Sequence, residues 1–258
     1  MPFSSYLIFI FGAMLGSFSN VVIFRWPRKE SIVFPGSRCP NCQHPIRFYD
    51  NIPLLSWFIL RGKCRDCGHK FSSRYAMVEL LMAVLFVLVW NTHGVSWTTL
   101  EYLILVFGLV TASFIDIDHF LLPDVLTFPG TLIGLVGAYF NPERSFLDSL
   151  MGFLFGFGFL WVIAYFYQVW RKQEGMGGGD IKLLGWIGAV LGWKVIPFVI
   201  VVASIFGSVL GLALAKKSER GLKTVIPFGP YLALGSLIFV CGGENLAFQY
   251  LRWFIPEL

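Results

Sequence analysis

Charge is scarce in this sequence. Only 14% of the 258 residues are Asp, Glu, Lys or Arg, whereas 56% are hydrophobic and the mean hydropathy is +0.70. Such a chain has too little polar surface for a water-soluble globule, so we expect it to lie in a membrane. A transmembrane helix needs about 20 mostly apolar residues, and runs approaching that length recur at 3–24, 77–90, 100–115 and onward to the C-terminus. We therefore predict an all-α polytopic membrane protein with about eight transmembrane helices.

The first apolar run has no basic residues before Arg25, and no small-residue cleavage pattern follows it. A removable signal peptide is therefore not expected, and residues 1–24 are predicted to form the first transmembrane helix. Ten of the twenty Lys and Arg residues lie between Arg25 and Arg74, and cytoplasmic loops carry the excess of basic residues in membrane proteins. This asymmetry favours an N-terminus outside the membrane and a cytoplasmic segment after the first helix. Because no aromatic-basic platform accompanies the charges, we expect contact with membrane lipid and none with nucleic acid.

Residues 25–75 form the one segment that is not typical of a membrane helix. Prolines spread through it exclude a long helix, at Pro27, Pro35, Pro40, Pro45 and Pro53. A segment of about fifty residues cannot bury a large apolar core without a staple. We therefore predict a small, stapled cytoplasmic insert at 25–75, followed by a membrane domain at 76–258.

Cysteine is also scarce, and four of the five cysteines form two CxxC pairs separated by twenty-one residues: Cys39 with Cys42, and Cys64 with Cys67. Two such pairs supply the four ligands of a tetrahedral zinc site, and four thiolates leave no position for a reacting water, so the metal is predicted to be structural. Iron remains open as a substitute. Disulfides or free buried cysteines are the alternatives, but disulfides rarely persist in the reducing cytoplasm. The nearby His44 and His69 are expected to be surface residues, and the lone Cys241 is expected to pack as a small hydrophobic residue.

Carboxylates interrupt the apolar sequence at two places. Asp116, Asp118 and Asp124 cluster where the third predicted span ends, and Asp180 ends the glycine-rich stretch 175–180. An acid at membrane depth is costly unless it faces a cavity or a partner. Peptide hydrolysis by two carboxylates needs one ionised and one protonated group around a water, and close like charges enforce this by sharing a proton. Either Asp116 or Asp118 could partner Asp180, and the alternative is that Asp180 only caps the next helix.

The apolar stretch after Asp180, residues 181–193, is too short to cross a bilayer. Thirteen residues make about 20 Å of helix, against a hydrocarbon core of about 30 Å. Asp180 is therefore expected to lie below the membrane surface, next to a cavity enclosed by protein or filled with water. The glycines before it would let a substrate strand approach.

Taken together, these residues resemble the bacterial prepilin peptidases, also called type IV leader peptidases, over essentially the whole chain. Residues 177–182 (GGGDIK) are similar to the family's GGGDxK signature, and residues 114–118 (FIDID) with 121–124 (LLPD) to its first aspartate motif. Residues 16–27, 49–57, 78–81 and 227–230 are similar to further family motifs, the last expected to be a tight backbone element near the site. Ala76 stands where the family usually has proline.

The resemblance implies an aspartyl protease domain at 76–258 in the bacterial inner membrane, with Asp116 and Asp180 catalytic. It implies that the substrates are precursors of type IV pilins or of type II secretion pseudopilins, cut after a short basic leader at the cytoplasmic face. It also implies N-methylation of the new N-terminal residue with S-adenosylmethionine. No strand followed by GxGxxG is present to supply a nucleotide-type methyl-donor site.

Two other classes of function compete with this interpretation. A transporter could relay protons or ions through Asp116, Asp118 and Asp180, because intramembrane acids also mark such pathways. A membrane adaptor could dock a partner on the zinc insert and use the acids only as helix caps. The role of Lys182, within the signature, stays open between a salt bridge and a topological anchor.

Overall fold

The computed structural model describes residues 3–173, 175–217, 226–247 and 249, and these residues form helices and loops with only isolated β-bridges. The predicted all-α fold with a four-cysteine insert is confirmed. The chain divides into two compact units, Met1–Asn91 and Thr92–Leu258.

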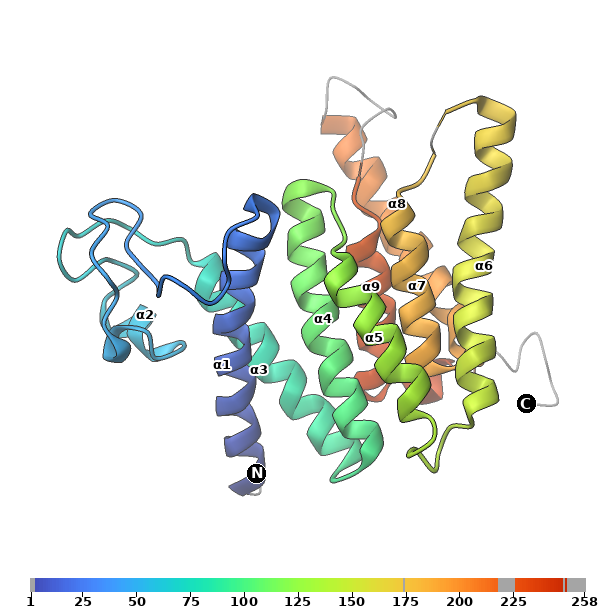
Figure 1. Cartoon of the computed structure of the whole chain (residues 1–258), viewed down its shortest axis with the longest axis horizontal. Coiled ribbons are helices and arrows are strands. Elements are labelled where there is room, and N and C mark those ends of the chain that lie inside the picture. The colour runs from blue at the N-terminus through green and yellow to red at the C-terminus, as the bar shows by residue number, and fades with distance from the viewer. Residues whose placement is uncertain (1–2, 174, 218–225, 248, 250–258) are drawn as a thin grey trace. The chain divides into compact units, whose positions relative to one another are not determined.

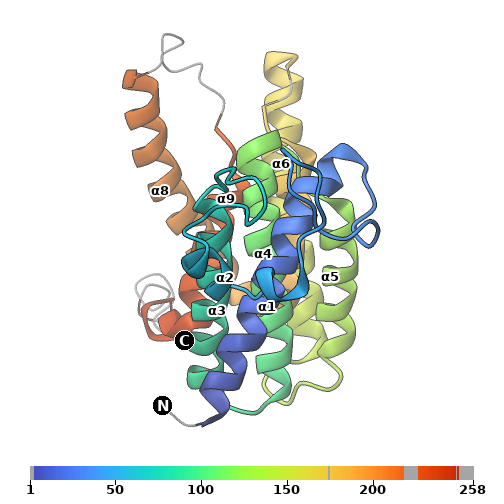
Figure 2. The same cartoon turned by 90° about the vertical axis from the view of Figure 1, so that its left-hand side faces the viewer.

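The first unit consists of two long apolar helices and the insert that joins them (Figures 1 and 2). Helix α1 (Phe3–Arg25) packs against α3 (Arg74–His93) through glycines: a Cβ at Gly12 would lie 2.8 Å from Cα of Ala83, and one at Gly16 would lie 2.6 Å from Cα of Glu79. Helices that pack in lipid use small residues in this way. The insert is mostly irregular, with the 3₁₀ turns η1 (Trp26–Arg28) and η2 (Phe48–Asp50) and the short helix α2 (Leu55–Ile59).

The second unit is a helical bundle arranged around α7 (Gly178–Leu191) (Figure 1). Five helices pack against it: α4 (Trp97–His119), α5 (Asp124–Gly137), α6 (Phe146–Arg171), α8 (Ile196–Lys217) and α9 (Gly229–Ile238). Every residue of α7 from Leu183 to Leu191 is buried. A helix that is apolar all round belongs in a core, so its neighbours shield this short helix.

Glycines allow the neighbours of α7 to approach closely. Gly152 of α6 lies against Gly188, where an added Cβ would lie 2.1 Å from the carbonyl oxygen of Gly188. The fully buried Trp186 fits against Gly108 of α4 and Gly130 of α5, where added Cβ atoms would lie 2.0 Å and 2.1 Å from its ring. The position of α7, which carries Asp180, is thus fixed by direct backbone and ring contacts.

Five helical segments among the described residues are long and apolar enough to cross a membrane: Phe3–Arg28, Arg74–His93, Trp97–His119, Phe146–Arg171 and Trp193–Lys216. Helices α5 and α7, with 14 residues each, and α9, with 10, are shorter. The helices that the structure describes outside the insert are thus of two kinds. The sequence predicted that the run holding α7 is too short to cross a bilayer, but it did not separate α5 and α9 from the long helices.

Candidate active site and metal centre

Asp116 lies in the last turn of α4, where its side chain is buried at 5% exposure. The helix ends just after it, because Phe120 adopts a left-handed conformation with φ 54° and donates its N–H to the Asp116 carbonyl. The side-chain Oδ2 of Asp116 accepts a hydrogen bond of 3.2 Å from the backbone N–H of Gly229. Gly229 opens α9 and belongs to the motif at 227–230, so that motif meets the aspartate with its backbone.

Asp180 lies in the first turn of α7 and is buried at 8% exposure. The N-cap of this helix is Gly177, with extended φ and ψ, and no side chain caps it. The alternative that Asp180 serves as the cap is therefore wrong. Its Oδ1 is buried and makes no hydrogen bond within the part of the chain that the structure describes. A buried carboxylate oxygen without a partner is costly, which makes Asp180 a strong candidate for contact with a substrate or a water.

The structure brings Asp116 and Asp180 together. Helices α4, α7 and α9 pack against one another, and the two carboxylates are close enough to interact electrostatically. The Leu122 side chain contacts both Gly179, which precedes Asp180, and Gly229, which donates to Asp116. An added Cβ would lie 2.7 Å from the Leu122 side chain at Gly179 and 3.2 Å from it at Gly229. Three segments distant in the sequence thus meet at one buried acidic pair.

The other two carboxylates of the motifs point elsewhere. Asp118 is exposed, because two residues along a helix turn a side chain through about 200°. Asp124 is exposed at the start of α5, and its Oδ1 accepts a 2.7 Å hydrogen bond from Nζ of Lys182. The Lys182 ammonium also lies 5.2 Å from the ring centre of Phe128. Lys182 therefore joins α7 to α5 by a salt bridge.

The four cysteines of the insert form one cluster, in which all Sγ atoms lie within 4.8 Å of one another. Sγ of Cys39 is 3.7 Å from Sγ of Cys67, and Sγ of Cys42 is 4.0 Å from Sγ of Cys64. A tetrahedral zinc with Zn–S bonds of about 2.3 Å requires S–S separations of about 3.8 Å. The two separations above agree with this value, and all four Sγ atoms already lie within 4.8 Å of one another, so the cluster fits a zinc ion.

The two halves of the cluster have the same backbone design. The N–H of Cys39 donates to the His44 carbonyl, and the N–H of Cys64 donates to the His69 carbonyl, at 3.0 and 2.8 Å. Each turn contains one residue with positive φ four positions after its first cysteine, Gln43 in one half and Gly68 in the other. The histidines thus contribute backbone atoms to the turns, and the ligand cluster consists of cysteines.

Backbone hydrogen bonds also affect the thiols. The hydrogen bond from the His69 backbone lowers the pKa of Cys67 to about 6. At Cys42 the bond from the His44 backbone acts in the same direction, but desolvation and the neighbouring thiols outweigh it and raise its pKa to about 12. A bound metal removes this difference, because a coordinating thiol is deprotonated outright.

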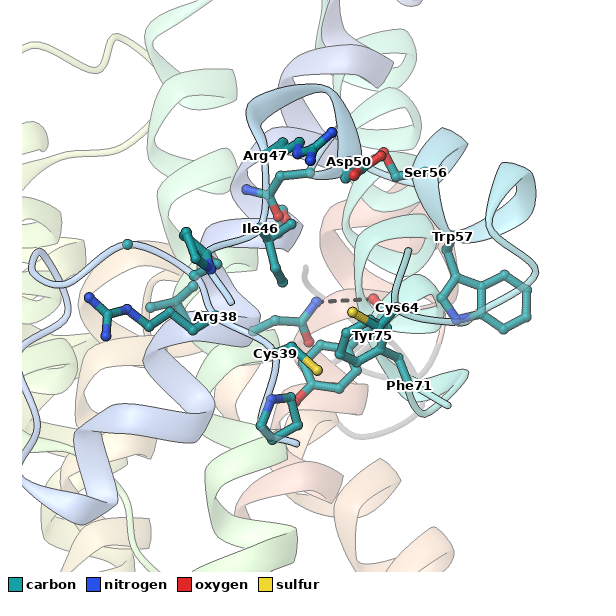
Figure 3. A pocket seen from close by; sticks show the side chains of 18 of the residues that line it. Arg38, Cys39, Ile46, Arg47, Asp50, Ser56, Trp57, Cys64, Phe71 and Tyr75 are labelled. Carbon is teal, nitrogen blue, oxygen red and sulfur yellow. Dashed lines mark hydrogen bonds between the residues drawn. The ribbon is translucent and has the colours of Figure 1, made fainter. Parts of the chain in front are cut away.

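Two buried acids outside these sites were not singled out from the sequence. Glu79 of α3 is 8% exposed, and Glu101 of α4 is 2% exposed. Glu79 lines a pocket of the first unit, and Figure 3 shows other residues that line it. The signal that could have found both is a lone acid inside an apolar run.

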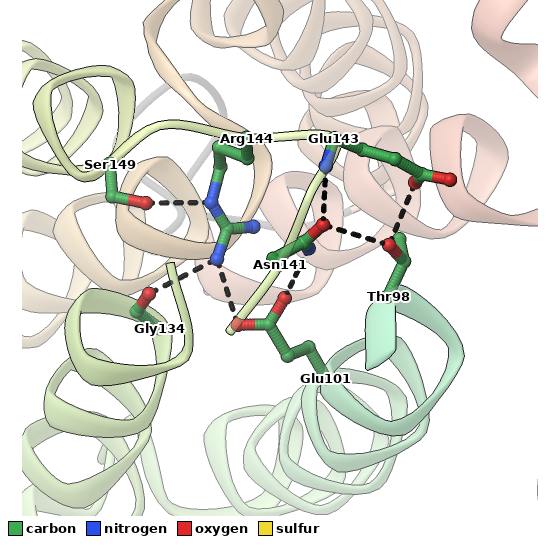
Figure 4. A network of polar contacts seen from close by, with 7 residues as sticks. All are labelled: Thr98, Glu101, Gly134, Asn141, Glu143, Arg144 and Ser149. Atoms are coloured by element: carbon green, nitrogen blue, oxygen red, sulfur yellow. Dashed lines mark hydrogen bonds and ion pairs between the residues drawn. The ribbon is translucent and has the colours of Figure 1, made fainter. Parts of the chain in front are cut away.

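Glu101 belongs to a polar network that ties α4 to the connection between α5 and α6 (Figure 4). Arg144 donates to Oε1 of Glu101 at 2.8 Å, to the Ser149 hydroxyl at 2.6 Å and to the Gly134 carbonyl at 3.1 Å. Asn141 donates to the second oxygen of Glu101 at 2.7 Å. Fifteen residues, or about 22 Å of helix, separate Glu101 from Asp116, so the network supports the bundle far from the acidic pair.

Comparisons with known proteins give a consistent result. The model described as "Bacterial Peptidase A24 N-terminal domain" matches residues 10–93, and the model described as "Type IV leader peptidase family" matches residues 103–212. A prepilin leader peptidase/N-methyltransferase of Aeromonas hydrophila is 39% identical, covering 96% of this chain and 94% of the relative. Proteins of the same name from Pseudomonas aeruginosa and Neisseria gonorrhoeae are 36% and 34% identical, covering 95% and 99% of this chain and 92% and 96% of the relatives. No solved structure matches the chain.

Proposed function

The chain belongs to the type IV leader peptidase family, and from this premise we propose that it cleaves type IV prepilins with Asp116 and Asp180 as its catalytic pair. The observation that carries this assignment is the buried pair itself. One carboxylate is held by the Gly229 N–H, and the other has a buried oxygen that makes no hydrogen bond within the described chain. The transporter and adaptor interpretations have no support in the comparisons.

The geometry distinguishes the two carboxylates. Gly229 donates a hydrogen bond to Asp116, and a hydrogen bond to a carboxylate favours its charged form. We assign Asp116 as the general base that takes a proton from the attacking water. Asp180 is assigned as the protonated partner that donates a hydrogen bond to the scissile carbonyl. After attack, the leaving amine takes a proton from the pair and the peptide C–N bond breaks.

Access to this site is expected along the glycines that precede Asp180. Gly177 and Gly178 are exposed, and a Cβ at Gly178 would meet nothing within 4 Å. Exposed backbone next to a buried acid lets an extended peptide approach without meeting side chains. The substrate proposed for this surface is the junction between the leader and the mature pilin or pseudopilin.

The proposed orientation agrees with this chemistry. The basic residues between Arg25 and Arg74 favour a cytoplasmic insert and an N-terminus outside the inner membrane. Asp116, at the end of α4, and Asp180, at the start of α7, then lie at the cytoplasmic side. A short basic leader remains on that side by the same rule, so the cleavage point is brought to the pair. The protein is surrounded by membrane lipid, and no nucleic acid takes part.

The second proposed activity is N-methylation. It is based on the relatives, which are named N-methyltransferases as well as peptidases. The proposed methyl donor is S-adenosylmethionine, and the acceptor is the α-amino group that cleavage exposes. The proposed zinc site is structural, because Cys39, Cys42, Cys64 and Cys67 would fill its four positions and leave none for a reacting water.

Cleavage by purified protein in detergent tests the peptidase. Wild type is expected to shorten a prepilin by its leader, and S-adenosylmethionine is expected to add one methyl mass to the product. Asp116→Asn and Asp180→Asn are expected to fold, retain zinc and fail to cleave. Cleavage at the wild-type rate by either variant would remove that residue from the mechanism.

A further inference from the structure

A cavity of the first unit lies between the insert and the helices α1 and α3 (Figure 3). Its volume is about 820 Å³, and every residue that lines it lies between Met14 and Glu79. Small-molecule sites have volumes of about 300–1,000 Å³. Neither Asp116 nor Asp180 lines this cavity.

The wall of the cavity combines apolar, aromatic and charged side chains. Aromatic rings come from both helices and from the insert, at Phe18, Phe24, Trp57, Phe71 and Tyr75. Asn20 of α1 donates a 3.0 Å hydrogen bond to the Tyr75 carbonyl, which closes the wall between α1 and α3. Cys39 and Cys64 also line the cavity (Figure 3), so the metal cluster forms part of its frame. Such a wall suits a flat heteroaromatic ring.

Glu79 supplies a buried carboxylate to this wall. It is 8% exposed, and its hydrogen bonds come from neutral groups, the Leu54 N–H at 2.7 Å and the Ser17 hydroxyl. Leu54 has φ 63° and ψ −55°, a conformation that a leucine adopts only when its surroundings enforce it. The insert is therefore held in a strained conformation that places a backbone donor on this carboxylate.

The second acid deep in the wall differs from Glu79. Asp50 makes three contacts of 2.6–3.1 Å with the guanidinium of Arg65, and these hydrogen bonds lower the pKa of Asp50. Its charge is thus already compensated within the protein. Glu79 receives only neutral donors in the contacts above. A cationic ligand in the cavity would therefore be drawn to Glu79.

We propose that this cavity binds S-adenosylmethionine, with the Glu79 carboxylate facing the positive charge of the sulfonium and the aromatic wall against the adenine. This inference rests on the proposed function, because it locates the donor site of the second activity. The ligand joins a heteroaromatic ring, a sugar and a sulfonium cation, and the cavity offers a partner for the ring and the cation. When bound there, it supplies a methyl group to the amine: the N–C bond forms, the C–S bond breaks with its electron pair left on sulfur, and the amine loses a proton to water.

Isothermal titration on purified full-length protein tests the role of Glu79 directly. Glu79→Gln keeps an oxygen that accepts from Leu54 and removes the charge. We expect it to weaken binding of S-adenosylmethionine about 10- to 100-fold. Binding of S-adenosylhomocysteine, which has no charge on sulfur, is expected to change several-fold less. Glu143→Gln, an exposed acid of the other unit, is the matched control and is expected to bind both ligands as wild type does.

A second measurement does not depend on any variant. Wild type is irradiated with radiolabelled S-adenosylmethionine, and the labelled peptides are mapped by mass spectrometry. Label within residues 14–79 is expected; label confined to residues 92–258 would overturn the proposal. So would equal affinity of folded Glu79→Gln and wild type for S-adenosylmethionine.

The outcomes distinguish a failure of the cavity assignment from a failure of the proposed function. If wild type cleaves and methylates while Glu79→Gln binds the donor unchanged, only the cavity assignment fails. If Glu79→Gln raises the KM for prepilin and leaves donor binding unchanged, the cavity receives the basic leader instead. If folded wild type neither cleaves nor methylates, the proposed function itself fails.

Discussion

Adding one methyl group at Gly229 perturbs the support of Asp116 without altering either carboxylate. A Cβ at this position would lie 2.7 Å from Oδ2 of Asp116, whereas ordinary contact begins at 3.4 Å. The carboxylate or the start of α9 must therefore move by about 0.7 Å, which lengthens the 3.2 Å N–H···O separation by up to that amount and weakens or breaks the hydrogen bond. A hydrogen bond to a charged group contributes about 1.5–3 kcal/mol.

If that bond holds Asp116 in its reactive position, Gly229→Ala should lower kcat/KM for prepilin cleavage by about 10- to 100-fold. The assay is initial-rate cleavage in detergent, with protein concentration corrected for folded, zinc-loaded enzyme. Gly158→Ala is the matched control, because a Cβ at Gly158 of α6 meets nothing within 4 Å. It should cleave as wild type does.

Two results would refute this reasoning. Wild-type cleavage by folded Gly229→Ala would show that the Gly229 N–H does not support the reaction. An equal loss of activity in Gly158→Ala would show that the helices tolerate no added methyl group, and the effect at Gly229 could not then be assigned to Asp116.

Three further predictions concern the supports around the site. Cys39→Ser should reduce bound zinc, measured by metal analysis, and lower the unfolding temperature of the insert, because one lost thiolate opens the shell; zinc at full stoichiometry would argue against this ligand set. Lys182→Met should change stability by less than about 1 kcal/mol and cleavage by only a few-fold, because its bridge to Asp124 is partly exposed, at 33% and 55% of the two side chains; a hundredfold loss of cleavage would give Lys182 a chemical role. Glu101→Gln should lower the free energy of unfolding by about 3–5 kcal/mol, because it leaves Arg144 buried without its charge partner; denaturation of the variant at the wild-type midpoint would contradict this.

The metal cluster shows what local spacing can predict. Each CxxC pair is closed by its own turn, so Cys39 to Cys42 and Cys64 to Cys67 contain most of the geometry that the ligands need. The acidic pair is different. Asp116 and Asp118 are equivalent in the sequence, and only the packing of α4 against α7 and α9 decides which one is buried beside Asp180. The family motif favoured Asp116 before any geometry was known.

Contacts between distant segments were beyond prediction from the chain alone. Gly229 reaches Asp116 across 113 positions, and no local pattern indicates that bond. The short helix α7 was expected from its length, but its near-complete burial depends on glycines contributed by α4, α5 and α6, such as Gly108, Gly130 and Gly152. Apolar runs predict that helices form in a membrane, but not which of them are shielded by others.

The most direct test of the central claim compares Asp116→Asn with Asp118→Asn in the prepilin cleavage assay, on protein shown to be folded and zinc-loaded. The two residues are two positions apart on one helix, yet one is buried against Asp180 and the other is exposed. The buried acidic pair predicts that Asp116→Asn is inactive and that Asp118→Asn retains appreciable cleavage. An active Asp116→Asn beside an inactive Asp118→Asn would contradict it.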